Sequence, residues 1–213
     1  MKSLNEYIIE KILINKSSKF INKIKVETRE QLETIILERY NKNKSFIDLT
    51  DIDISELDDL SGVFDFLNNK VEVIDISGWD TSNVTNMAYM FNRCEKLKNI
   101  IGIENLDVSK LEKANFMFDS CENLVELDLT NWNPKLLQKT RCMFCGCSNL
   151  KIIKNIENWQ LPNIKNVSYM FCNCTKLDVD LSNWDLTHIK DFLKYQGLTA
   201  NSGITKNHYP KLN

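Results

Sequence analysis

Apolar and polar positions repeat along most of the chain with a period of 26 or 27 residues. Each unit ends in Met-Phe-x-x-Cys, and the closing cysteines are Cys94, Cys121, Cys147 and Cys174. Upstream of them, the same period is marked by a large apolar residue: Trp79, Leu106, Trp132, Trp159 and Trp184. A period of this length is typical of stacked supersecondary units, each of which buries its apolar face against its neighbours. The pattern therefore predicts a solenoid whose tryptophans and closing cysteines face the core.

Within one unit, the spacing of apolar residues predicts a short helix followed by a strand. Val84, Met87 and Phe91 follow Trp79 at steps of five, eight and twelve residues, which places them on one helical face. The Trp-Asp-x-Ser/Thr stretch before them indicates a turn and a helix N-cap. Strands are predicted after each closing cysteine or its equivalent, at 71–76, 99–103, 124–129, 151–156 and 177–181. The segment 124–129 keeps the L-x-x-L-x-L pattern of a leucine-rich repeat.

The first fifty residues predict a cap of different construction. An apolar stripe over 3–15 indicates an amphipathic helix, and Ile24 and Val26 alternate as in a short strand. Thr28 and Gln31 form a capping box for a second helix at 29–41. We therefore expect an N-terminal α/β capping region at 1–50, about five repeats of 25–27 residues at 51–192, and a C-terminal cap or tail at 193–213.

Several phrases of the sequence resemble one family of repeat proteins. DISGWDTSNVTNMAYMFNRCEKL, DLTNWN followed by MFCGCSNL, and LPNIKNVSYMFCNCTKLDVDLSNWDLTHI are similar to the repeats of BspA-like leucine-rich-repeat proteins, over about residues 51–192. That family occurs in many bacteria, mycoplasmas and mobile elements. The resemblance implies an α/β, leucine-rich-repeat-like right-handed solenoid with parallel strands on one face and short helices on the other. It also implies non-enzymatic protein binding, often to host or cell-surface targets.

Charge and hydropathy narrow the classes of partner. A net charge of −2 argues against a general nucleic-acid binder. Basic residues nevertheless gather in the third and fourth units, so direct nucleic-acid contact stays a secondary alternative; they are Lys110, Lys113, Lys135, Lys139, Arg141 and Lys165. Neither a secretory signal nor an apolar run of about 18 residues is evident, and seven cysteines fit a reducing compartment. We expect a cytoplasmic protein with no membrane partner.

The cysteines between 142 and 174 are the strongest candidates for chemistry. Cys142-x-x-Cys145-x-Cys147 with Cys172-x-Cys174 offers more than four thiols, and zinc binding is one reading of them. Because Cys147 and Cys174 occupy the repeated core position, only Cys142, Cys145 and Cys172 remain for a metal. Neighbouring outer helices would lie about 8–10 Å apart, too far for a disulfide between Cys145 and Cys172. We expect no metal and no cofactor.

Motifs for catalysis are scarce. The two histidines, His188 and His208, follow the last cysteine, and the sequence contains no Gly-rich phosphate loop, H-E-x-x-H or G-x-S-x-G. A fully packed solenoid offers no evident pocket for a Cys–His pair. We therefore expect a protein that is not an enzyme.

The predicted strand face is then the candidate binding surface. Five strands about 4.8 Å apart would present a strip of about 20–25 Å, a fair footprint for a protein partner. The polar residues expected to point outward there are Glu72, Asp75, Lys98, Glu126, Asp128, Lys151, Lys154, Asp178 and Asp180.

We expect a monomeric, non-catalytic protein–protein interaction module. An intracellular effector or inhibitor is favoured, of the kind carried by phages or mobile elements and aimed at a bacterial defence protein such as a CRISPR nuclease or another nucleoprotein complex. A surface adhesin-type binding protein is the alternative, and a cysteine-based zinc-binding protein is the second.

Overall fold

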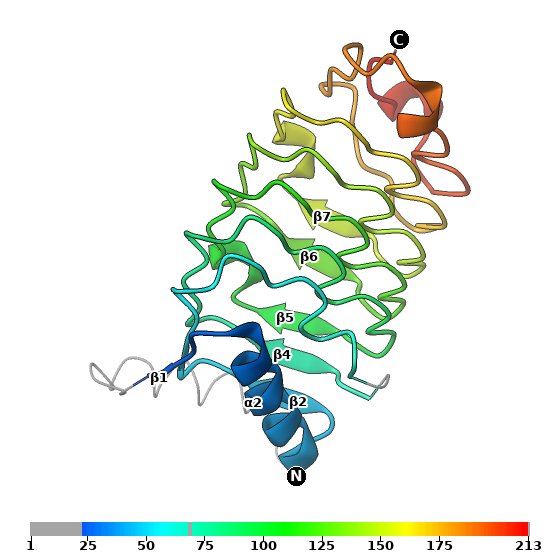
Figure 1. Ribbon diagram of the computed structural model, residues 1–213. Coiled ribbons are helices and arrows are strands. Elements are labelled where there is room, and N and C mark those ends of the chain that lie inside the picture. The colour runs from blue at the N-terminus through cyan, green and yellow to red at the C-terminus, as the bar shows by residue number, and fades with distance from the viewer. Residues whose placement is uncertain (1–22, 68–69, 213) are drawn as a thin grey trace.

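The computed structural model describes residues 23–67 and 70–212, and the helix predicted at 3–15 lies outside them. Within these ranges the chain winds into coils that lie one behind another along a single axis (Figure 1). Helix α2 (Arg29–Lys42) lies at the N-terminal end of the stack, and the last coil lies at the opposite end.

Short parallel strands line one side of the stack and form a three-stranded sheet in the order β2-β4-β5 and a two-stranded sheet, β6-β7. A separate two-stranded sheet pairs β1 with β3. The register joins each strand to the equivalent residues of the next coil, as in Ile47↔Ile74↔Ile100. Their bounds are β1 (Ile24–Lys25) and β3 (Ile52–Asp53), β2 (Phe46–Asp48), β4 (Val73–Asp75) and β5 (Asn99–Ile101), and β6 (Glu126–Asp128) and β7 (Ile152–Lys154). The strands are shorter than predicted, and the expected strand at 177–181 is irregular.

The N-terminal helix forms as its capping box predicts. The backbone N–H of Gln31 donates to Thr28 Oγ1, while Gln31 Oε1 accepts from the backbone N–H of Thr28. Leu32, Ile36 and Tyr40 form its buried side. Two otherwise unpaired N–H groups of the first turn region are thereby satisfied, and the apolar stripe attaches the helix to the first coils.

The short helices predicted in every repeat are absent from the described coils, and this expectation is corrected. Five successive coils instead turn through two residues in the left-handed conformation, such as Phe116 (φ 57) and Ser120 (φ 58), and the first described coil turns through one, Gly62 (φ 65). A right-handed helix cannot continue through such residues. Each coil forms a run of turns, in which Met117 N–H donates to Ala114 and Cys121 N–H donates to Phe118. These turns, rather than a helix, place buried side chains three and four residues apart in the sequence.

The turn segments are joined to one another by backbone hydrogen bonds between coils. Phe118 N–H donates to the carbonyl of Met143 at 2.8 Å, and Phe144 N–H donates to Met170 at 2.9 Å. This pattern continues beyond 192, because Phe171 N–H donates to Leu198 at 2.9 Å. Residues after 193 therefore add contacts of the same kind to the end of the stack.

The core is built from stacked copies of the same side chains. Consecutive phenylalanines lie nearly parallel, with ring centroids 5.0–5.6 Å apart; they are Phe64, Phe91, Phe118, Phe144 and Phe171. All four tryptophans are at most 6% exposed, which confirms their predicted place in the core. Burying each of these rings contributes about 1.5–3 kcal/mol to stability.

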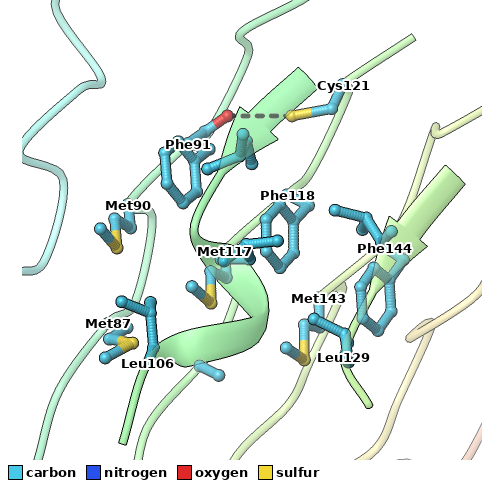
Figure 2. Packing of buried hydrophobic residues seen from close by; sticks show 14 of the residues in the cluster. Met87, Met90, Phe91, Leu106, Met117, Phe118, Cys121, Leu129, Met143 and Phe144 are labelled. Carbon is cyan, nitrogen blue, oxygen red and sulfur yellow. Dashed lines mark hydrogen bonds between the residues drawn. The ribbon is translucent and has the colours of Figure 1, made fainter. Parts of the chain in front are cut away.

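The closing cysteines add a hydrogen bond to this packing. The thiol of Cys121 donates to the carbonyl oxygen of Phe91 in the preceding coil at 3.1 Å (Figure 2). Equivalent bonds run from Cys94 to Phe64, from Cys147 to Phe118 and from Cys174 to Phe144. Each closing cysteine is thus a buried apolar group and also a donor to the coil before it.

Candidate functional site

The strand side of the stack is interrupted between β5 and β6. These strands belong to different sheets, and a hollow of about 560 Å³ lies between them. Gly102, which follows β5, lies so close to the preceding coil that an added Cβ would be 2.3 Å from Ser77 Cα. The residues after Gly102 form the 3-10 helix η1 (Ile103–Asn105), which contacts β6 and lines the same hollow.

Four of the predicted binding residues surround this hollow, namely Lys98, Glu126, Asp128 and Lys154. Lys154 Nζ lies 2.7 Å from Glu126 and 2.9 Å from Asp128, and these acidic partners raise its pKa. Lys98 pairs with Glu72 of the preceding coil at 2.8 Å. All of these side chains are 37–53% exposed, so the pairs contribute little to folding and remain accessible to a partner.

Asp75 does not belong to the exposed strip, and its predicted outward position is corrected. It is 2% exposed in β4, the central strand of its sheet. Its carboxylate accepts from the backbone N–H and the hydroxyl of Ser77. The pattern Asp-x-Ser/Thr therefore marks a turn in which the carboxylate satisfies local donors, and at Asp75 the strands on either side also cover it.

The same turn pattern recurs at two predicted binding residues that remain exposed. Asp128 Oδ1 accepts from the backbone N–H and hydroxyl of Thr130, and Asp180 accepts from the backbone N–H of Ser182. These hydrogen bonds are the leading cause that lowers the pKa of each carboxyl group. Both side chains hold a turn and also present charge to solvent.

The remaining predicted residues lie toward the C-terminal half. Lys151 is exposed beside β7, and Asp178 pairs with His208 Nδ1 at 2.8 Å. The hydrogen bond with Asp178 raises the pKa of His208, and it lowers the pKa of Asp178. His208 is therefore part of a contact between the last coil and its neighbour.

The sequence did not predict that apolar side chains lie inside the charged strip on the strand side. Ile101 and Val125 line the hollow, and Ile152 is exposed beside them; Val125 and Ile152 are each 49% exposed. The signal was present in the sequence, because Val125 stands where neighbouring repeats carry Glu72, Lys98 and Lys151. An apolar centre with a charged rim is the usual anatomy of a protein interface.

The turn segments that end in Met-Phe-x-x-Cys form a second side of the stack, called here the turn side. It holds a cluster of three cysteines, Cys142, Cys145 and Cys172. A hydrogen bond with Cys145 and the nearby Arg141 guanidinium lower the pKa of Cys142 to about 7, although burial opposes them. The same thiol contact raises the pKa of Cys145, and burial raises that of Asp119 in the adjacent coil. All seven cysteines are free, and in the described part of the chain no three His, Cys, Asp or Glu side chains are placed to hold a metal ion.

The predicted spacing around these cysteines also needs correction. Gly146 N–H donates to the carbonyl of Cys172 at 2.8 Å, so the coils carrying Cys145 and Cys172 approach like strands of a sheet. Such neighbours lie about 4.8 Å apart rather than the 8–10 Å of packed helices. The distance argument against a disulfide between them therefore fails.

No helix among the described residues combines the length and apolar character that a membrane span requires.

A family model described as "Mycoplasma protein of unknown function, DUF285" matches residues 34–153 and, in a second overlapping match, residues 102–202. No curated protein and no solved structure matches the chain. Since the two matches together cover most of the repeated coils, the chain belongs to the DUF285 family of Mycoplasma proteins of unknown function.

Proposed function

We propose that this protein is a non-catalytic binding module, a BspA-like, leucine-rich-repeat-like right-handed solenoid that binds another protein through its strand side. The single observation that supports the proposal best is the hollow between β5 and β6, with Ile101 and Val125 inside it and paired charges around it. Apolar anchors at the centre supply most of the energy of a protein interface, while rim charges direct association and orientation.

The charge arrangement indicates the kind of partner surface that fits. Lys98 and Lys154 alternate with Glu72, Glu126 and Asp128 around the hollow, so neither sign dominates. A partner with an apolar projection flanked by charges of both signs is complementary to this surface. The partner class we propose is an intracellular protein, with a bacterial defence nuclease among the candidates; this choice rests on the expectation of a cytoplasmic protein, whereas the resemblance to BspA-like proteins alone implies host or cell-surface targets.

A matched pair of substitutions tests the surface. Val125→Glu places a charge in the hollow, and Leu136→Glu makes a comparable change at a site off the strand side with similar exposure, 49% and 45%. In affinity capture from a lysate of the cells that carry the gene, followed by titration of the captured protein, Val125→Glu should weaken binding at least about tenfold. Leu136→Glu should bind like the parent chain.

The reverse result, with Leu136→Glu weakened and Val125→Glu unchanged, would move the interface to the other side of the stack. Equal binding by both variants would contradict the strand-side proposal. Circular dichroism of both variants serves as the control for folding, because each replaced side chain is half exposed.

A further inference from the structure

The turn side carries a pair of thiols that the binding proposal does not use. Cys142 and Cys145 are three residues apart in one turn, where Cys145 N–H donates to the carbonyl of Cys142 at 3.2 Å, and each thiol shifts the pKa of the other. Residues joined across such a turn have Cα atoms less than about 7 Å apart, within the range that a disulfide requires.

The surroundings of the two thiols are unequal. The Arg141 guanidinium lies over the Phe116 ring at 5.9 Å, and it lowers the pKa of Cys142. The carboxyl group of Asp119, in the adjacent coil, raises the pKa of Cys145 instead. A cation beside one thiol and a carboxyl group beside the other favour ionisation of Cys142 and keep the proton on Cys145.

The two thiols differ in exposure. Cys145 and Cys172 are partly exposed, and Cys142 is 9% exposed. The closing cysteines, in contrast, lie in the core and donate to phenylalanine carbonyls. The pair is therefore chemically and spatially separate from the repeated cysteine ladder.

We propose that Cys142 and Cys145 form a reversible thiol-modification site that accepts small disulfides, with Cys142 as the nucleophile and Cys145 as the resolving thiol. The Cys142 thiolate attacks one sulfur of a small disulfide R–S–S–R, a Cys142–S–S–R bond forms, and RS⁻ leaves and takes up a proton. Cys145 then loses its proton and attacks the Cys142 sulfur, which releases the second RS⁻. Two protein thiols are oxidised to one disulfide, and the small disulfide is reduced to two thiols.

The sequence around the pair makes the product easy to map. Trypsin cleaves after Arg141, so Cys142, Cys145 and Cys147 share the peptide 142–151, while Cys172 and Cys174 lie in the peptide 166–176. A Cys142–Cys145 disulfide stays within the first peptide, whereas a Cys145–Cys172 disulfide links the two peptides.

The experiment incubates the folded, full-length chain with oxidised glutathione at pH 7.5 and reads the products by intact and peptide mass spectrometry. We expect the intact mass to fall by two hydrogens, with the disulfide inside the peptide 142–151, and dithiothreitol to reverse it. Cys145→Ser should stop at a mixed disulfide of Cys142 with glutathione. Cys142→Ser should abolish the reaction, and the matched control Cys172→Ser should react like the parent.

Three results would overturn the proposal. They are peptides 142–151 and 166–176 joined by a disulfide, glutathione found on Cys172 in the parent chain, and a folded chain that does not react. Circular dichroism of each serine variant before incubation identifies any variant that is unfolded. For such a variant, the parent chain and Cys172→Ser alone decide the outcome through their peptide maps.

Discussion

The inner and outer sides of the same turn segment carry cysteines with opposite properties. On the inner side, burial raises the pKa of Cys94 to about 12, and each closing thiol donates to a phenylalanine carbonyl. On the outer side, the thiol of Cys145 and the Arg141 guanidinium lower the pKa of Cys142 to about 7. Cys94 and Cys142 lie in equivalent turn segments two repeats apart, so the position within the coil, rather than the residue type, decides the chemistry.

The largest expected difference between the two sides is in thiol reactivity. The pKa values of about 7 and about 12 correspond to about a hundred-thousand-fold difference in the acid dissociation constant. In the folded chain, alkylation of Cys142 by iodoacetamide should rise with a midpoint near pH 7, and Cys94 should stay unlabelled up to pH 9. Site-resolved mass spectrometry across a pH series measures both. In urea, alkylation of all seven cysteines should have its midpoint at about pH 8.5. If Cys142 of the folded chain had the same midpoint, the two sides would not differ in thiol reactivity.

The next largest effect concerns the aromatic rings on the two sides. Phe118→Ala removes a fully buried ring that is stacked between Phe91 and Phe144, and should lower the free energy of unfolding by about 3–5 kcal/mol. Phe116→Ala removes a partly exposed ring stacked on Tyr89, and should cost about 0.5–1.5 kcal/mol. Urea unfolding followed by circular dichroism gives both values. Equal losses would mean that the outer stack is as important to stability as the core.

A smaller effect is expected from the thiol hydrogen bonds. Cys147→Ala removes one of two donors to the buried carbonyl of Phe118, which still accepts from the Cys121 N–H, and should cost about 0.5–1.5 kcal/mol. The control on the outer side, Cys172→Ala, should change stability by less than about 0.5 kcal/mol. Cys147→Ser should recover part of the loss if the hydrogen bond matters, and no recovery would assign the cost to packing alone.

The smallest effect belongs to an exposed contact, His208 with Asp178. Because its folded pKa is raised, His208 stabilises the chain fully below its unfolded pKa of about 6.5, and this contribution disappears as the pH rises through the folded pKa. The pKa of Asp178 is lowered, so its contribution is present above about pH 3.8 and disappears at lower pH. The melting temperature of the parent relative to His208→Gln should therefore be highest between about pH 4 and 6.5. A constant difference across that series would show that the pair does not titrate with folding.

The repeat itself could be predicted from the sequence because the same side chains fill the same layer in each coil. Trp132, Trp159 and Trp184 are buried at their period, as the sequence indicates. The helix prediction failed for a specific reason. Tyr89 and Phe116 adopt left-handed conformations that glycine or asparagine would normally mark, so no turn signal interrupts the apolar spacing.

The candidate site was predicted only in part. Lys98, Glu126 and Lys154 could be placed on the strand side by alternation, since a strand directs successive side chains to opposite faces. Asp75 could not, because its burial depends on local donors from Ser77 and on the strands at either side. The hollow also depends on how the coils that carry β5 and β6 lie against each other, which composition and periodicity do not encode.

The left-handed positions on the outer side have a practical consequence for protein engineering. Gly62, Tyr89, Phe116, Cys142, Tyr169 and Gly197 share this backbone conformation although their side chains differ widely. The scaffold thus tolerates different side chains at equivalent positions of neighbouring coils, which lie about 5 Å apart as adjacent strands do. Randomising Tyr89, Phe116 and Tyr169 together would turn the outer column into a display library on an unchanged scaffold, from which new ligands could be selected.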